Sequence, residues 1–163
     1  MMKKHFLLIA ILFASCAEQK QEPKTAGYSI RGEEESYMIG SDETTDFIRK
    51  WADAHNERDM ESILSMEKAD IKIELPDGTV INGQDEHSKV LESFFANNVT
   101  WKPYWMLPYN SVVAKEKWVI AGFALTSNVD GEENVVLHMG DIQLEDGLVS
   151  RIIVYENQRP KKQ

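Results

Sequence analysis

The 163-residue sequence predicts an α+β domain, with about three helices in its first half and a run of antiparallel strands in its second half. Between residues 42 and 95, apolar residues recur at helical spacing, interrupted by an alternating segment at 70–75. After residue 99 the apolar residues alternate, and Asp-Gly pairs at 130–131 and 146–147 separate the alternating segments. Because Asp-Gly is a strong hairpin signal, we expect the order helix, helix, two strands, helix and about four strands.

Composition and charge narrow the classes of protein to which the chain can belong. Hydrophobic residues make up 42% of the sequence and aromatic residues 9%, enough to build one buried core. The single cysteine excludes a disulfide framework and a cysteine-based zinc site. The formal net charge of -9 would repel a phosphate backbone, so we expect no nucleic-acid partner. We also expect no cofactor, because the sequence has no glycine-rich phosphate loop.

Residues 1–15 have the pattern of a targeting signal. Lys3 and Lys4 precede an apolar run over residues 6–14, which is too short to span a bilayer. The run ends just before Cys16, and this arrangement resembles a bacterial lipoprotein signal peptide, in which the cysteine is acylated and becomes the first residue. An ordinary signal peptide and a short membrane anchor are the alternatives.

This resemblance implies a place in the bacterial cell envelope. Ala17 rather than Asp follows the cysteine, which by resemblance points to the outer membrane in a host with two membranes. The acyl groups on Cys16 would be the only membrane contact. Residues 16–41 are mostly polar and aperiodic, so we expect a flexible tether before a domain at 42–157 and a polar tail at 158–163.

The first half of the domain predicts helices at three places. Thr44 or Thr45 can cap the first helix. One face of this helix is expected to be buried, and it carries Phe47, Ile48, Trp51, Ala52 and His55. Asp59 can cap a short second helix, and the Asn82-Gly83 break precedes a third. The third helix is expected to bury Val90, Leu91, Phe94 and Phe95.

Two strands are expected between the second and third helices. Residues 70–75 alternate cleanly between apolar and polar side chains. The turn Pro76-Asp77-Gly78 then returns the chain to residues 79–81, because proline presets one φ angle and glycine permits a positive one.

The strand over residues 101–109 is unusually aromatic. Regular alternation would place Trp101 and Trp105 on one face and Tyr104 on the other. Pro103 between them implies an edge position or a bulge. Both faces of this strand must therefore contact something apolar, namely the core on one side and a ligand, a partner subunit or the chain's own N-terminal segment on the other.

Three short motifs on these elements resemble those of the NTF2-like (SnoaL-like, cystatin-superfamily) domains. They are Asn56-Glu-Arg-Asp59 after the first helix, Asn82-Gly83-Gln-Asp-Glu before the third, and the closing segment from Gln143 through Gly147 to Tyr155. The resemblance covers roughly 115 residues. It implies a conical curved antiparallel sheet wrapped around about three helices, with a pocket between the sheet and the first helix. Because family members often dimerise through the outer face of this sheet, the resemblance also implies a homodimer.

The best-known enzymes of this superfamily are ketosteroid isomerases, which use a general-base Asp and two oxyanion donors, Tyr and Asp. By resemblance the tyrosine position is Trp51, the base position is Leu75 and the acidic donor position is Gly140. Leucine and glycine cannot titrate, and an indole N–H is a weaker donor than a phenol. The isomerase reaction is therefore not expected, and the sequence favours a protein that is not an enzyme.

Histidines and aromatic rings supply the candidate site. His138 shares a strand face with Ile142, which is expected to line the pocket opposite Trp51. There it could act as a general base, anchor a ligand or form a structural hydrogen bond. The candidate ligand-binding residues are Trp51, His55, Trp105, His138 and Ile142.

A metal site is not expected from the sequence. His55 precedes Asp59 by four residues and could pair with it on one helix, but no third ligand stands at a known spacing. His87, in the first turn of the third helix, is expected to be exposed.

Three functions remain open at this point. The first is a cell-envelope lipoprotein whose pocket binds a small apolar or aromatic molecule, or a protein partner, without chemistry. The second is a small isomerase, hydrolase or dehydratase that uses His138 as acid and base. The third is a structural assembly module whose pocket is filled by its own side chains.

Overall fold

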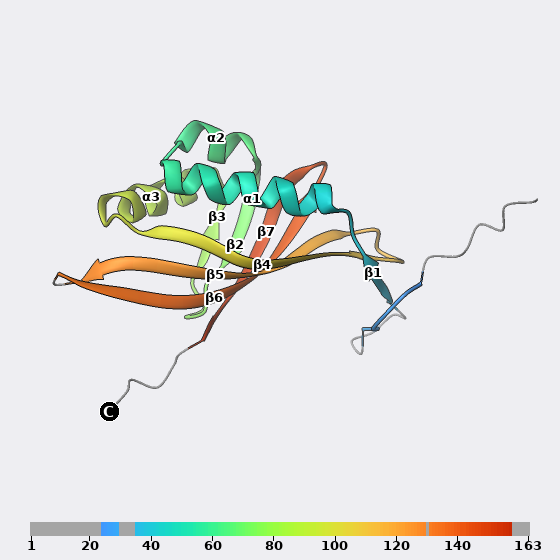
Figure 1. Ribbon diagram of the computed structural model, residues 1–163. Helices are drawn as coiled ribbons and strands as arrows, with labels where there is room; N and C mark the ends of the chain where they lie inside the picture. Colours follow the sequence, from blue (N-terminus) through green and yellow to red (C-terminus); the bar gives the residue numbers. More distant parts are fainter. Residues whose placement is uncertain (1–23, 30–34, 130, 158–163) are drawn as a thin grey trace, which may run out of the picture.

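The computed structural model of the protein describes residues 24–29, 35–129 and 131–157, and it confirms the α+β prediction (Figure 1). The elements along the chain are β1 (Tyr37–Ile39), α1 (Asp42–Glu57), α2 (Met60–Ser65), β2 (Glu67–Glu74), β3 (Val80–Asn82), α3 (Gly83–Ala96), β4 (Thr100–Ser111), β5 (Lys117–Val129), β6 (Glu132–Glu145) and β7 (Leu148–Asn157). From α1 onward this is the predicted order.

All seven strands join one curved sheet in the order β1-β4-β5-β6-β7-β2-β3. Neighbouring strands are antiparallel except β2 and β7, which run parallel. The three helices lie on one side of the sheet (Figure 1). The core fills the space between helices and sheet, and its most deeply buried residues include Ile48, Trp51, Ile63, Ile71, Val119, Phe123 and Ile142.

Polar side chains fix the ends of the first two helices. The Ser41 side chain accepts a hydrogen bond from the Glu43 N–H, so α1 begins earlier than the cap predicted at Thr44 or Thr45. Asp59 caps α2 as predicted, accepting from the Ser62 N–H at 3.0 Å. Arg58 links the two helices in the left-handed conformation.

The hairpins of the second half follow the predicted meander. Asp146 and Gly147 join β6 to β7 with φ angles of 53° and 82°, the two positive values of a type I′ turn. Between β5 and β6 the ladder continues to the pair Val129 and Glu132. Residue 130 of the other predicted Asp-Gly turn lies outside the described residues.

A bulge in β4 separates two tryptophans that the sequence places on one face. The register with β5 shifts between Pro103 and Trp105. Trp101 therefore stacks inward on Phe123, whereas Trp105 lies on the outer face against Gly122 and is 40% exposed. The prediction that the two tryptophans share a face is wrong. Of the two arrangements that Pro103 implied, an edge position or a bulge, the register shows a bulge.

The sheet begins within the segment predicted to be a tether. β1 lies inside residues 16–41 and pairs with β4, where Tyr37 stands opposite Ser111. Just before it, the Glu35 carboxylate accepts hydrogen bonds from the backbone N–H groups of Val112, Val113 and Ala114, at 2.8 to 2.9 Å. These bonds lower the pKa of Glu35, so the contact is present at pH 7 and is lost only when acid protonates the carboxyl.

We expect Glu35→Ala to free the β4–β5 connection locally. The amides of Val113 and Ala114 lose their acceptor and should exchange hydrogen at least about tenfold faster at pH 7, whereas the Val112 N–H still donates to the Ser36 carbonyl oxygen. Hydrogen–deuterium exchange followed by NMR or mass spectrometry measures this. Glu116→Ala, which removes another acidic side chain from the same connection, should leave those exchange rates unaltered. Equal acceleration by both variants would contradict the role given to Glu35.

Several sequence predictions fall on residues that the structure does not describe. They are the signal peptide at 1–15, the acylated Cys16 and the tail at 158–163. Within the described ranges, no helix combines the length and the apolar character that crossing a membrane requires. A homodimer through the outer sheet face stays a prediction; exposed apolar residues there include Ile39, Tyr104, Trp105, Leu107 and Tyr155.

Candidate functional site

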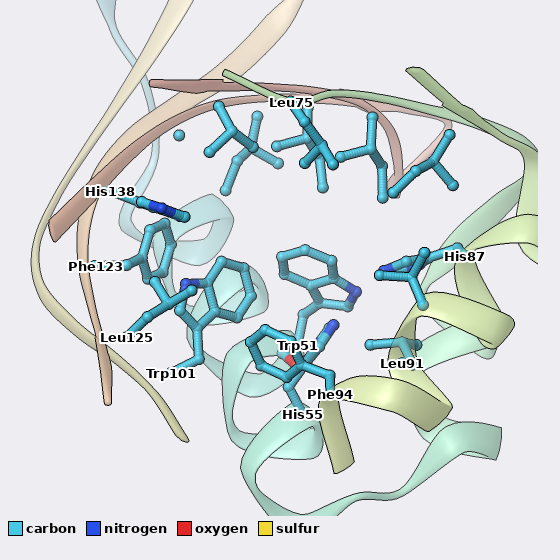
Figure 2. Close-up of a pocket in the computed structure, with 17 residues that line it drawn as sticks. Trp51, His55, Leu75, His87, Leu91, Phe94, Trp101, Phe123, Leu125 and His138 are labelled. Atoms are coloured by element: carbon cyan, nitrogen blue, oxygen red, sulfur yellow. The ribbon is translucent and has the colours of Figure 1, made fainter. Parts of the chain in front are cut away.

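A cavity of about 150 Å³ lies between α1, α3 and the inner face of the sheet (Figure 2). Its wall is almost entirely apolar. The aromatic lining residues are Trp51, Phe94, Trp101 and Phe123, and aliphatic residues from β2, β3, α3, β5, β6 and β7 line the rest. The only titratable side chains among the described lining residues are His55, His87 and His138.

Four of the five candidate ligand-binding residues line this cavity. Trp51 and His55 project from α1 and His138 from β6 (Figure 2). Ile142, also on β6, is the fourth. Trp105 does not, because the β4 bulge turns it outward, where it lines a separate pocket together with Tyr104. Trp101, which was predicted to share a face with Trp105 but was not a candidate ligand-binding residue, lies inward and lines the cavity.

The three positions that resemble catalytic positions of ketosteroid isomerases also border the cavity. They hold Trp51, Leu75 and Gly140. The Trp51 indole N–H is already used, since it donates to Glu67 Oε1 at 2.9 Å. Gly140 has an ordinary φ, and a Cβ added there would be 3.4 Å from the Phe123 ring. Glycine at this position therefore provides space rather than a special backbone conformation.

His138 stands on the opposite side of the cavity from His87 (Figure 2). Its Nε2 atom is 3.5 Å from the Glu156 carboxylate, across the β6–β7 pair. The side chains of His138 and Glu156 are 20% and 34% exposed. The acid–base candidate from the sequence is thus at the cavity wall, with a partly exposed carboxylate as its neighbour.

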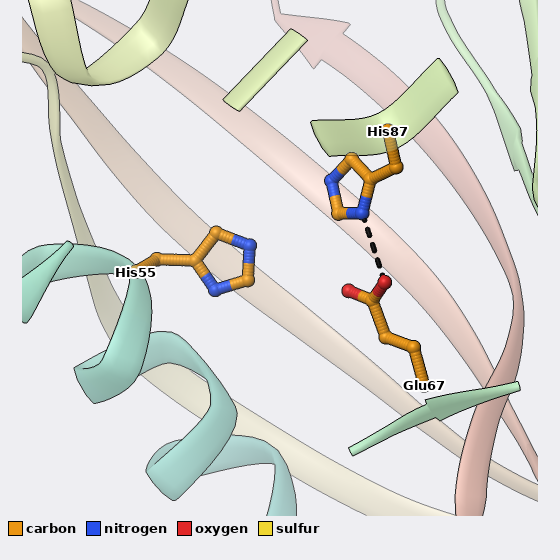
Figure 3. Close-up of side chains that lie close together, drawn as sticks. All are labelled: His55, Glu67 and His87. Carbon is orange, nitrogen blue, oxygen red and sulfur yellow. Dashed lines mark hydrogen bonds and ion pairs between the residues drawn. The ribbon is translucent and has the colours of Figure 1, made fainter. Parts of the chain in front are cut away.

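A second polar group, which the sequence did not predict, borders the cavity through its two histidines, His55 and His87. It consists of His55 from α1, Glu67 from β2 and His87 from α3 (Figure 3), and we call it the histidine–glutamate cluster. The Glu67 side chain has no exposed surface, and its Oε2 atom is 3.0 Å from His87 Nδ1. The prediction that His87 is exposed is wrong: the residue is only 6% accessible.

Helical periodicity explains the position of His87, but strand periodicity does not explain that of Glu67. His87 precedes the buried Leu91 by four residues, so both side chains leave α3 on the same face. Glu67 is buried at the start of β2, but the register of β2 with β7 shifts between Glu67 and Lys72, and Ala69 between them is exposed. The predicted strand began at residue 70, and its alternation cannot be extended backward across this irregularity to Glu67.

His55 enters the cluster as a neutral imidazole. Its Nδ1 atom is 2.7 Å from the Trp51 carbonyl oxygen, which can only accept, so Nδ1 carries the proton. Burial lowers the pKa of His55 to about 4, and nearby His87 acts in the same direction. The Nε2 lone pair is therefore free at neutral pH. The pair of His55 and Asp59 that the sequence suggested does not form. The Asp59 carboxylate instead accepts hydrogen bonds from Ser62.

The Glu67 side chain is unusually buried for a carboxyl group. Its two oxygens accept from Trp51 Nε1 and from His87 Nδ1. Among the described residues, no lysine or arginine forms an ion pair with it. One candidate ligand atom each from His55, Glu67 and His87 lies within 4.8 Å of the others. The argument against a metal site, that a third ligand is lacking, therefore does not hold.

Solved structures identify the fold. A protein from Kribbella flavida described as a candidate ketosteroid isomerase superposes with a TM-score of 0.61 and 18% identity, over 77% of this chain and 85% of its own. SalBIII, an epoxide hydrolase/cyclase-like enzyme in pyran ring formation in salinomycin, gives 0.62 and 16%, over 71% and 92%. An NTF2-like protein of unknown function from Cytophaga hutchinsonii gives 0.54 and 15%, over 70% and 89%.

The chain therefore has the NTF2-like fold that its three motifs suggested. Identities of 15 to 18% show the fold alone, because this architecture serves unrelated functions. No protein-family model matches the sequence. No curated protein matches it either.

Proposed function

We propose that the protein binds a small apolar or aromatic molecule in the cavity beside Trp51. The observation that carries this proposal is the cavity itself, which is about 150 Å³ and walled by aromatic and aliphatic side chains. A cavity of about 150 Å³ with an apolar wall can accept a single aromatic ring. An unfilled space at this place argues against a module whose pocket is closed by its own side chains.

The three histidines give the bound molecule a defined orientation. His138 lies at one side of the cavity and the histidine–glutamate cluster at the other, with apolar wall between them (Figure 2). A ligand that is apolar in its middle and carries a hydroxyl or carbonyl oxygen at one end fits this distribution. In an otherwise apolar site, a small number of polar groups is enough to fix the orientation of the ligand.

An enzyme that uses acid–base chemistry is the second candidate function. It is favoured by one observation, that two histidines at the cavity wall each have a carboxylate neighbour, Glu156 for His138 and Glu67 for His87. The described neighbours include candidate isomerases and cyclases, which supports a reaction on a small molecule without defining it.

We place this activity in the bacterial cell envelope, on a lipid anchor at Cys16. The support is the sequence of residues 1–16 alone: two lysines, a short apolar run and a cysteine at its end. The polar residues that follow would hold the domain away from the membrane surface.

Native mass spectrometry of the full chain, extracted from bacterial membranes in mild detergent, tests both proposals. A small mass that is lost on denaturation indicates a bound ligand and gives its formula. An acyl mass that survives denaturation and disappears in Cys16→Ser indicates the lipid anchor. A bare, unmodified chain would contradict both proposals, and the same spectrum distinguishes a monomer from a homodimer.

A further inference from the structure

We propose that His55, Glu67 and His87 form a binding site for one divalent transition-metal ion, such as Zn²⁺, at the inner wall of the cavity. The three side chains come from three different elements, α1, β2 and α3, and all three are buried (Figure 3). This inference goes beyond the proposed binding of an apolar molecule and does not depend on it, because its ligand is the ion itself.

The distances in the cluster suit a metal ion after small side-chain movements. His87 Nδ1 and Glu67 Oε2 are 3.0 Å apart. Two ligand atoms each about 2.1 Å from an ion are separated by about 3.0 Å when the angle at the ion is about 90°. The three candidate ligand atoms all lie within 4.8 Å of one another. Two ligand atoms on opposite sides of an ion are about 4.2 Å apart, which is only slightly less.

Hydrogen bonds outside the cluster already orient its ligand atoms. Trp51 makes two of them: its carbonyl oxygen accepts from His55 Nδ1, and its indole N–H donates to Glu67 Oε1. These contacts do not use His55 Nε2, and among the described residues Glu67 Oε2 contacts only His87 Nδ1, in the hydrogen bond that an ion would replace. A metal-binding histidine characteristically donates its other N–H to a backbone carbonyl or a carboxylate, which is the arrangement of His55.

The chemistry of the three donors selects the kind of ion. Two imidazoles and one carboxylate suit zinc, iron or nickel, whereas calcium and magnesium prefer oxygen ligands. An ion here would also supply the positive charge that no described lysine or arginine gives to Glu67. It would take the place of the hydrogen bond between Glu67 and His87, and a neutral His87 would then carry its ring proton on Nε2 rather than on Nδ1.

The position of the cluster would leave part of the ion's coordination open. His55 and His87 both line the cavity, so the side of the ion away from the three residues would face that space. An oxygen atom of a cavity ligand could complete the coordination there. The site would resemble catalytic zinc and iron centres in having three protein ligands and an open position.

Metal titration of the full chain without an added histidine tag tests the inference. After dialysis against EDTA and then buffer, the protein should bind one equivalent of Zn²⁺ by calorimetry, and one equivalent of Co²⁺ should develop a visible absorption spectrum. We expect His55→Gln, Glu67→Gln and His87→Gln each to weaken the Kd for Zn²⁺ at least about 100-fold.

The matched control is His138→Gln, which alters the third histidine of the same cavity but lies outside the cluster. This variant should bind Zn²⁺ as the unaltered protein does. Circular dichroism of each variant establishes that it is folded. Absence of Zn²⁺ and Co²⁺ binding to the unaltered protein, or equal binding by folded His87→Gln and His138→Gln, would overturn the metal site.

Discussion

Replacing Glu67 with alanine is expected to lower the free energy of unfolding by about 3–5 kcal/mol, because two buried hydrogen-bond partners each cost about 1–3 kcal/mol when left unsatisfied. The Glu67 side chain has no exposed surface, and its two oxygens satisfy the Trp51 indole N–H and His87 Nδ1. Truncation leaves both groups without a partner in a site that is closed to bulk water, and it opens a cavity between α1, β2 and α3.

Urea or guanidinium unfolding with EDTA present measures this effect without any contribution from bound metal. Glu67→Gln keeps an acceptor for Trp51, so we expect it to cost only about 1–2 kcal/mol. The control is Glu156→Ala at the partly exposed His138 pair, which should change stability by less than about 1 kcal/mol. Equal losses for Glu67→Ala and Glu156→Ala would show that the inner cluster is not held by its buried carboxylate.

The order of the elements could be predicted because it depends on local signals. Helical spacing from residue 47 to residue 55, the Asp59 cap and the Asp146-Gly147 turn each act within a few residues of themselves. From these local signals the helices and hairpins could be predicted, and the short motifs that resemble those of NTF2-like domains lie beside them. The curved sheet then follows, because the fold class and the strand order along the chain leave few ways to bury the apolar faces.

The errors arose where distant segments meet. β1 has only three residues and becomes a strand because β4 offers it an edge, so its own sequence gives almost no signal. The bulge after Pro103 reverses the face on which Trp105 lies, since strand alternation has a period of two. Local alternation predicts neither event reliably.

In the candidate site, too, residues placed by local signals could be predicted, whereas contacts between distant segments could not. Trp51, His55, His138 and Ile142 could be placed at the cavity because each lies on an element whose inward face was evident. The histidine–glutamate cluster could not, because it needs the packing of α3 against β2 across twenty residues of sequence. A buried glutamate is also contrary to expectation from residue type, and only its partners, Trp51 and His87, account for it.

Gly140→Leu is expected to close the cavity and weaken ligand binding at least about 30-fold. The four added carbon atoms would project into a space of about 150 Å³, and even a Cβ would already lie 3.4 Å from Phe123. The backbone at Gly140 has no positive φ, so leucine is compatible with the strand and the protein should remain folded. The variant therefore tests whether ligands occupy this cavity without removing any polar group.

The binding measurement uses 4-fluorophenol, a single ring with one hydroxyl, observed by ¹⁹F NMR during titration with protein. Gly140→Ala should bind it within about threefold of the unaltered protein, since its Cβ would make ordinary contacts of 3.4 to 3.8 Å. Met139→Leu, on the outer face beside Gly140, should have no effect. If Gly140→Leu binds the probe as tightly as Met139→Leu does, the probe binds elsewhere. If the unaltered protein binds neither 4-fluorophenol nor 4-fluorotoluene, a cavity of this size does not serve as a site for single-ring ligands.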